Sequence, residues 1–105
     1  MEKRRENRIK KRVMVKFGEN NYERLGFTSN ISSGGLHIAS TQILPSGREI
    51  TILLEDNDRV YSLKGEVRWS IKYPSHFYSY MLSGMGVKLK DIPLEFKEYL
   101  RRSIM

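Results

Sequence analysis

Residues 61–71 read Tyr-Ser-Leu-Lys-Gly-Glu-Val-Arg-Trp-Ser-Ile, and this stretch decides the fold class. Apolar residues and one glycine occupy every odd position, with charged residues or serine between them. A period of two is typical of a β-strand with one buried face and one solvated face. Trp69 shares the parity of Leu63 and Val67, which predicts a position in the core for it. Gly65 inside the strand predicts a bulge or a close approach of another backbone.

The same alternation recurs along most of the chain. It predicts five further strands, at residues 13–17, 22–29, 36–38, 50–54 and 81–89. In the second of these, Leu25 and Phe27 share one face. Residues that favour turns separate the strands, at 18–21, 30–35, 44–47, 55–58 and 72–76.

The end of the chain changes to a helical period. Phe96 and Leu100 are four residues apart, Asp91 can cap a helix over about 92–104, and Pro93 is tolerated in its first turn. Six short strands followed by one helix predict a mainly all-β fold. We expect a six-stranded antiparallel β-barrel with a C-terminal α-helix on an edge or an open end.

Length and composition bound the class of protein. The 105 residues fit one domain. The absence of cysteine excludes disulfides, thiolate catalysis and cysteine-based zinc sites. No apolar run approaches the roughly 20 residues that span a bilayer, and the charged N-terminus is not followed by the apolar segment of a secretory signal. We therefore expect a cytoplasmic domain that is not inserted in a membrane.

Most of the net charge of +7 lies at the N-terminus. Residues 1–16 hold eight Lys or Arg against two Glu, whereas the other 89 residues hold eleven basic and ten acidic residues. This division predicts a flexible basic arm over residues 1–12, and a barrel with its helix over residues 13–105. Such an arm suits a polyanionic partner, such as nucleic acid, a phosphate-bearing ligand or an anionic membrane surface. A solvated tail that aids solubility accounts for the charge equally well.

The chain carries little that points to catalysis. Its two histidines, His37 and His76, have no partner at ligand or triad spacing. His37 falls on the solvated face of its strand, and loop packing explains His76. The acidic stretch 55–58 lacks the ligand spacing, central glycine and terminal glutamate of a calcium loop, so a hairpin turn fits it better. The sequence therefore predicts no enzyme, no metal site and no cofactor.

The first functional cluster is an R-x-x-x-R just before the first strand, formed by Arg8 and Arg12. The planar fork of an arginine can grip a phosphate, or the O6 and N7 edge of guanine. Arg4 and Arg8 have the same spacing. A basic arm alone therefore explains this pattern as well as a ligand site does.

The second cluster is an N-x-S-x-x-G between two predicted strands, formed by Asn30, Ser32 and Gly35. A side-chain amide and a hydroxyl beside glycines offer donors and acceptors on a backbone that a flat base can approach closely. Taken on its own, this string is better explained by an ordinary Asx or serine turn.

In this order the two clusters resemble the motifs of the PilZ domain, the bacterial receptor module for the second messenger cyclic di-GMP. That family carries R-x-x-x-R on an N-terminal switch loop and [D/N]-x-S-x-x-G after its second strand. The resemblance continues through residues 33–36, 65–69 and 86–89, and so covers nearly the whole chain. It implies the same barrel and helix that the alternation predicts independently.

The resemblance also implies a ligand site. Arg8 and Arg12 would contact the phosphates and one guanine edge, Asn30 and Ser32 would bind the other guanine, and Gly35 would keep the turn open. The arm would order on the dianionic ligand and so signal to a protein partner, without covalent chemistry. Further candidate ligand residues are Arg4, Arg5, Lys11, Ser33, Gly34, Trp69 and Gly86.

Two other functions stay open. A small β-barrel with a basic arm can bind nucleic acid by stacking and phosphate contacts, but residues 17–105 carry a net charge of only +1, which argues against it. A scaffold that binds only protein would not need both motifs intact. Members of the family bind either one ligand or an intercalated ligand dimer, and Arg5 favours the dimer. The resemblance also leaves the biological output open among motility, adhesion, virulence and the polysaccharides of biofilms.

Overall fold

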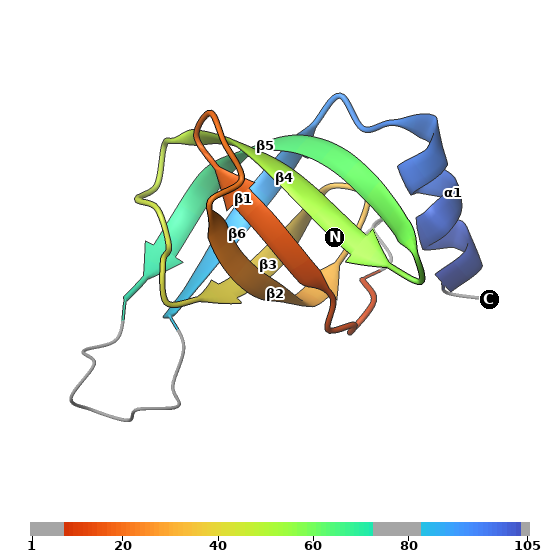
Figure 1. Ribbon diagram of the computed structural model, residues 1–105, viewed down its shortest axis with the longest axis horizontal. Helices are drawn as coiled ribbons and strands as arrows, with labels where there is room; N and C mark the ends of the chain where they lie inside the picture. The colour runs from red at the N-terminus through yellow and green to blue at the C-terminus, as the bar shows by residue number, and fades with distance from the viewer. Residues whose placement is uncertain (1–7, 73–82, 104–105) are drawn as a thin grey trace, which may run out of the picture.

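The computed structural model describes residues 8–72 and 83–103, and its strands form one closed barrel (Figure 1). Neighbouring strands are antiparallel, in the order β1-β2-β3-β6-β5-β4, and β1 closes the ring by pairing with β4. The predicted six-stranded barrel and C-terminal helix are confirmed. The elements are β1 (Met14–Gly18), β2 (Arg24–Ile31), β3 (Gly35–Ser40), β4 (Glu49–Asp56), β5 (Arg59–Ile71), β6 (Ser83–Lys90) and α1 (Leu94–Ser103).

Alternating side chains of the strands fill the interior of the barrel. Val15 and Phe17 of β1 are fully buried, as are Ile52 and Leu54 of β4. The period-two pattern of the sequence is therefore the pattern of burial. Each such side chain stabilises the fold by about 1.5–3 kcal/mol. The other buried hydrophobic residues are Val13, Ile31, Leu36, Ile38, Leu44, Ile50, Tyr61, Leu63, Val67, Met85, Val87, Leu89, Phe96, Tyr99 and Leu100.

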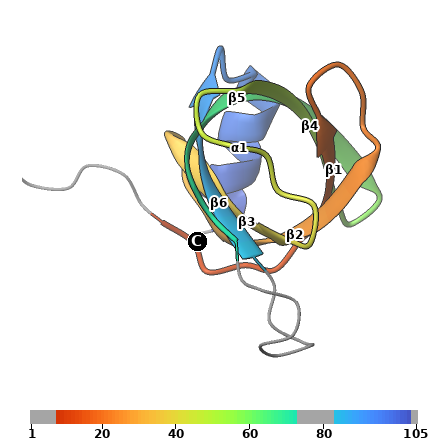
Figure 2. The same ribbon diagram turned by 90° about the vertical axis from the view of Figure 1, so that its left-hand side faces the viewer.

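The helix α1 covers one open end of the barrel, which Figure 2 shows by looking along the barrel from the opposite end. Phe96, Tyr99 and Leu100 are its buried residues, as the predicted helical stripe requires. Tyr61 of β5 packs against Phe96 and Tyr99, with ring centroids 5.8 and 4.8 Å apart. The helix thus closes the core at an end of the barrel.

The helix begins later than the sequence predicts. Its first residue is Leu94 rather than residue 92, because the carbonyl of Pro93 accepts hydrogen bonds from the N–H groups of Phe96 and Lys97. Asp91 precedes the helix with a φ of 48°, two residues before the capping position. Within residues 8–72 and 83–103, no helix is long and apolar enough to cross a bilayer.

A bulge in β5 turns two predicted core residues outward. The pairing of β5 with β6 shifts register between Val67 and Trp69, so Arg68 is an extra residue and the side chains beyond it change face. Trp69 is 44% exposed and Ile71 is 51% exposed. The predicted core position of Trp69 is therefore wrong, since alternation by itself carries no record of a bulge.

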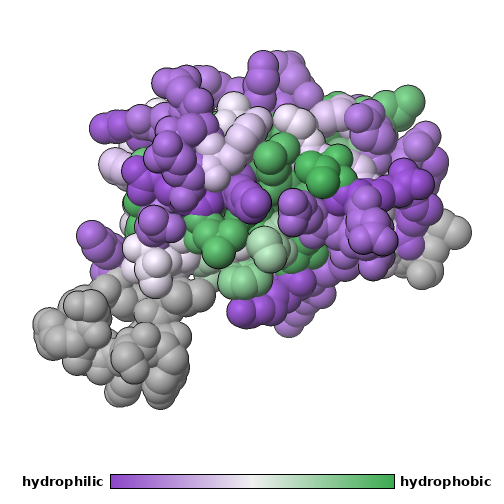
Figure 3. All heavy atoms as spheres, in the orientation of Figure 1, coloured by the Kyte–Doolittle hydropathy of each residue, from purple (hydrophilic) through white to green (hydrophobic). Residues whose placement is uncertain are grey.

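The strand β2 presents apolar side chains to solvent. Leu25 and Phe27 do share a face, but it is the outer one: Leu25 is 46% exposed and Phe27 is half-buried. Gly26 and Thr28 point inward instead. Figure 3 shows hydrophobic side chains among hydrophilic ones on the side of the barrel that carries β1 and β4.

Two of the described turns between strands are short. The turn predicted over residues 30–35 reduces to residues 32–34, because β2 continues to Ile31 and β3 begins at Gly35. The acidic stretch 55–58 forms the β4–β5 hairpin, with φ of 52° at Asn57 and 65° at Asp58, as a type I′ turn requires. The described ranges contain no group of three or more His, Asp or Glu that could hold a metal ion. His76 and the start of the predicted strand 81–89 lie outside the described residues.

The described end of the basic arm is attached to the barrel. Ile9 forms an antiparallel bridge with Ile31, with N–H···O distances of 2.8 and 2.9 Å. The Thr28 hydroxyl accepts a hydrogen bond from the N–H of Val13 (3.0 Å) and donates one to the carbonyl of Lys11 (2.7 Å). Ile9 also packs against the core, so backbone hydrogen bonds and an apolar contact hold this end of the arm along β2.

Candidate functional site

A depression lies on the outer surface where β3, β6 and the end of β5 run side by side. Its volume is about 460 Å³, and we name it the β3–β6 pocket. Strand pairing builds it, since Gly86 of β6 lies opposite His37 on one side and Trp69 on the other. The residues that line it are Arg8, Asn30, Gly34, Gly35, Leu36, His37, Arg68, Trp69, Gly86, Val87 and Lys88.

Two aromatic rings form the floor of this pocket, because β6 presents glycines beneath them. A Cβ atom on Gly86 would overlap the indole of Trp69, and one on Gly84 would lie 2.7 Å from Nε2 of His37. The rings therefore lie closer to β6 than they could if Gly84 or Gly86 carried a side chain. Their centroids are 5.4 Å apart, with an angle of 32° between the planes. A floor of this kind suits stacking against a planar ring.

Cationic side chains surround the floor. Arg8, Arg68 and Lys88 line the pocket, and none of its lining residues is acidic. Partial burial lowers the pKa of the His37 imidazole, so the positive charge at neutral pH comes from the other three side chains. A flat floor with cations at its rim suits an anionic ligand that carries a planar ring.

The two sequence motifs meet at one edge of the pocket. The guanidinium of Arg8 donates a hydrogen bond of 2.6 Å to Oδ1 of Asn30, although 22 positions separate the two residues. The Ile9–Ile31 bridge lies next to both residues and holds the arm alongside β2. Residues of both predicted clusters therefore line the β3–β6 pocket, Arg8 from the first and Asn30 and Gly35 from the second.

Ser32 builds the turn beside this edge. It is fully buried, and its Oγ accepts hydrogen bonds from the N–H groups of Gly34 and Gly35, both at 3.2 Å. It does not line the pocket, whereas Gly34 and Gly35 do. A Cβ atom on Gly35 would overlap the carbonyl oxygen of Val87 on the paired strand, so the close approach requires glycine. Ser33 is exposed in the same turn.

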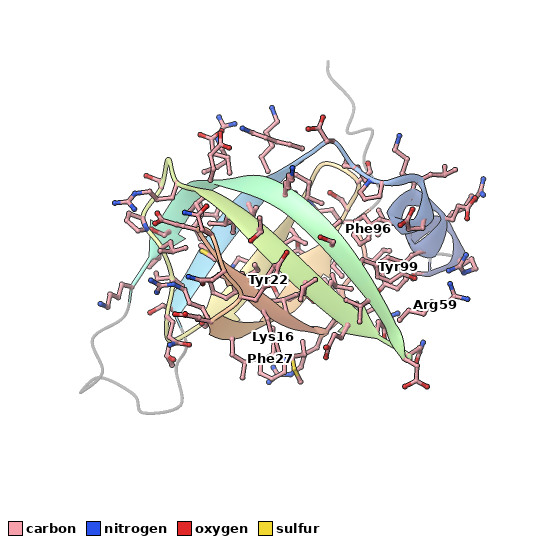
Figure 4. All side chains as sticks on the ribbon, turned by 45° about the horizontal axis from the view of Figure 1, so that its top comes forward. Lys16, Tyr22, Phe27, Arg59, Phe96 and Tyr99 are labelled. Atoms are coloured by element: carbon pink, nitrogen blue, oxygen red, sulfur yellow. The ribbon has the colours of Figure 1, made fainter. Side chains whose placement is uncertain are left out.

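The other described cations of the arm lie away from the pocket. Arg12 stacks over the ring of Phe27, with its Cζ 4.3 Å from the ring centroid. Lys11 pairs with Asp56 at 2.8 Å, and its Nζ lies 5.1 Å from the centroid of Tyr99. Figure 4 shows Tyr99 on the side of α1 that faces the barrel, and Phe27 on the outside of the barrel. The structure thus separates the two arginines of the first motif.

A small polar network joins Lys11 to the helix. The Tyr99 hydroxyl donates a hydrogen bond of 2.8 Å to the same Asp56 oxygen that Lys11 contacts. Partial burial opposes the charge of Asp56, but the hydrogen bonds from Lys11 and Tyr99 outweigh it and lower the pKa of this carboxyl. Burial, with the hydrogen bond to Asp56, raises the pKa of Tyr99. Lys11 therefore has partners that tie the arm to the end of the barrel.

The sequence predicts some of the residues that line the pocket but not others. The predicted residues Arg4 and Arg5 lie outside the described residues. The alternation along their strands places His37 and Lys88 on the outer face of the barrel. That position is the sequence signal that could have identified them. Arg68 is brought in by the bulge, for which the sequence has no such signal. The predicted residues that do line the pocket are Arg8, Asn30, Gly34, Gly35, Trp69 and Gly86.

Comparison with known proteins places the chain in a family. The fold is similar to that of the Bacillus subtilis inhibitor of motility (MotI/DgrA), with a TM-score of 0.73 over 99% of this chain and 16% sequence identity. The chain spans 53% of that protein, about half its length. No curated protein sequence matches the chain significantly. The family model of the PilZ domain matches residues 2–105, and the chain therefore belongs to the PilZ domain family, a family of cyclic di-GMP receptors.

Proposed function

We propose that this chain binds cyclic di-GMP in the β3–β6 pocket. The observation that carries the proposal is the meeting of both family motifs there, where Arg8 donates a hydrogen bond to Asn30 at the pocket rim. One guanine would stack on the ring floor with its edge toward these two residues. The phosphates would lie among the cations of the rim, Arg8, Arg68 and Lys88.

The second motif arginine would move when the ligand binds. Arg12 contacts the ring of Phe27, and an exposed contact of this kind stabilises by only about 0.5–1 kcal/mol. A charge-assisted hydrogen bond to a phosphate is worth about 1.5–3 kcal/mol. Binding would therefore favour a rearrangement of residues 8–12 that takes Arg12 from Phe27 to the ligand.

This movement would give the receptor its output. When Arg12 moves away from Phe27, the ring of Phe27 becomes exposed. This ring lies beside Leu25 and Met14, which are 46% and 38% exposed. Met14 pairs with Phe27 across β1 and β2, so the three side chains share one outer face. A protein partner that needs this apolar surface would then bind only in the presence of the ligand, in the cytoplasm of the cell.

Isothermal titration calorimetry tests the proposal, with GTP and linear pGpG as control ligands. We expect saturable binding of cyclic di-GMP alone, and its stoichiometry distinguishes a single ligand from an intercalated dimer. Arg8→Ala should weaken binding about 10- to 150-fold, because a charge-assisted contact of about 1.5–3 kcal/mol is lost.

Lys10→Ala is the matched control, since it removes the same charge from an exposed residue that does not line the pocket. It should change the affinity less than about twofold. Equal losses in Arg8→Ala and Lys10→Ala, with a steep dependence on salt, would instead indicate diffuse electrostatic binding of a polyanion such as nucleic acid.

A further inference from the structure

The imidazole of His37 packs beside the indole of Trp69, which is the only tryptophan of the chain. Trp69 is 44% exposed and follows a bulge, so the interior of the barrel does not hold its ring. Within the described residues, the bare backbone of Gly86 lies beneath the indole and the imidazole of His37 lies beside it. The orientation of the pocket floor therefore depends on what fixes His37.

His37 is itself held from two sides. Its Nδ1 lies 2.6 Å from Oγ of Ser29, and Gly84 leaves the space in which its ring lies. Ser29 is the extra residue where the pairing of β2 with β3 shifts register between Thr28 and Asn30. A bulge re-aims the side chain that it adds. The bulges in β2 and β5 thus bring their side chains to the same residue. The bulge in β2 directs Ser29 toward His37, and the bulge in β5 turns Trp69 outward beside His37.

We propose that His37 is a positioning residue, which holds the Trp69 indole flat over Gly86 so that a planar base of the ligand can stack on it. The effect on ligand binding rests on the proposed function, whereas the effect on the indole does not. Partial burial lowers the pKa of His37. A neutral imidazole can pack against the indole without repelling the cations that line the same pocket, Arg8, Arg68 and Lys88.

Fluorescence of Trp69 tests the positioning without any ligand. His37→Ala should increase quenching by acrylamide and shift the emission to longer wavelength, because the indole loses its neighbour. His37→Phe should restore the wild-type values, since it keeps a flat ring, and Ser29→Ala should fall between them. Lys16→Ala, which changes an exposed residue of β1 that does not line the pocket, is the control and should have no effect. Equal quenching in the wild type and His37→Ala would overturn the proposal.

Titration of the same variants with cyclic di-GMP tests the consequence. His37→Ala should weaken binding about two- to twelvefold, as the loss of one ring–ring contact implies, and His37→Phe should bind within about twofold of the wild type. Wild-type affinity in a His37→Ala protein whose indole is more accessible would refute the role in binding. If the wild type does not bind, the proposed function fails, and the quenching result still decides whether His37 positions Trp69.

Discussion

Replacing Gly86 by alanine perturbs the floor of the pocket without changing the barrel core. The new Cβ atom would lie 2.5 Å from Cε2 of Trp69, whereas ordinary contact begins near 3.4 Å, so the ring must withdraw by about 0.9 Å at that atom. Trp69 is 44% exposed and can swing toward solvent. The lost stacking on His37 costs about 0.5–1.5 kcal/mol, and alanine recovers about 0.5–1 kcal/mol over glycine in a strand. The free energy of unfolding should change by less than about 1 kcal/mol.

The affinity for cyclic di-GMP should fall much further. Stacking of a base on an aromatic side chain is worth about 1–3 kcal/mol. Gly86→Ala displaces the indole from the position in which it would stack, so binding should weaken about 5- to 150-fold. Calorimetric titration measures this loss, and thermal unfolding followed by circular dichroism measures the stability of the same preparation.

Gly35→Ala is the matched comparison, because its new Cβ atom meets backbone instead of a mobile side chain. It would overlap the carbonyl oxygen of Val87, so β3 and β6 must separate, and the 3.0 Å hydrogen bond from the N–H of Leu89 to the carbonyl of Gly34 must weaken. We expect a loss of about 2–4 kcal/mol, a fall of at least about 8 °C in Tm. Equal destabilisation by both alanines would show that Trp69 cannot move away from Gly86, and wild-type binding in Gly86→Ala would show that the ligand does not stack on this indole.

Two further predictions concern the end of the barrel. Asp56→Asn should lower the free energy of unfolding by about 1–2 kcal/mol at pH 7, because Lys11 loses its ion pair. The pKa of Asp56 is lowered in the folded protein, so its contribution is present above about pH 3.9 and is lost as the pH falls through the folded value. Urea unfolding should therefore separate wild type and variant at pH 7, and the difference should shrink as the pH falls below about 3.9; a difference that stays undiminished in acid would contradict the ion pair. Asp58→Gly should raise the free energy of unfolding by about 0.5 kcal/mol, because Asp58 has a φ of 65° in a type I′ turn that prefers glycine there. A destabilised Asp58→Gly protein would show that the aspartate side chain has a role in the turn beyond its backbone conformation.

The sequence predicts the architecture of this protein because burial follows local alternation. Phe17, Ile52 and Leu63 face inward at the positions that a period of two assigns to them. The stripe of Phe96 and Leu100 likewise identifies the helix that closes the barrel. These features depend only on neighbours along the chain, so one sequence is enough to predict them.

The site depends on the register of strand pairing, which the pattern of the sequence does not specify. The bulge at Arg68 arises from the pairing of β5 with β6, and it moves Trp69 from the predicted core to the pocket floor. The same holds for Arg12, whose place over Phe27 follows from how the arm lies along β2. A motif predicts which residues share a chemical role. Strand pairing decides which of those residues are in contact when no ligand is bound.

The most direct test of ligand binding in the β3–β6 pocket is a proton–nitrogen correlation spectrum of the ¹⁵N-labelled domain during titration with cyclic di-GMP. We expect saturable shift changes for the amides of Gly34 and Gly86 and for the indole N–H of Trp69, while the amide of Ile52 in β4 stays unchanged. A spectrum that does not change at saturating ligand would contradict the central claim that the β3–β6 pocket receives this ligand. Changes confined to β1 and β4 would contradict it as well.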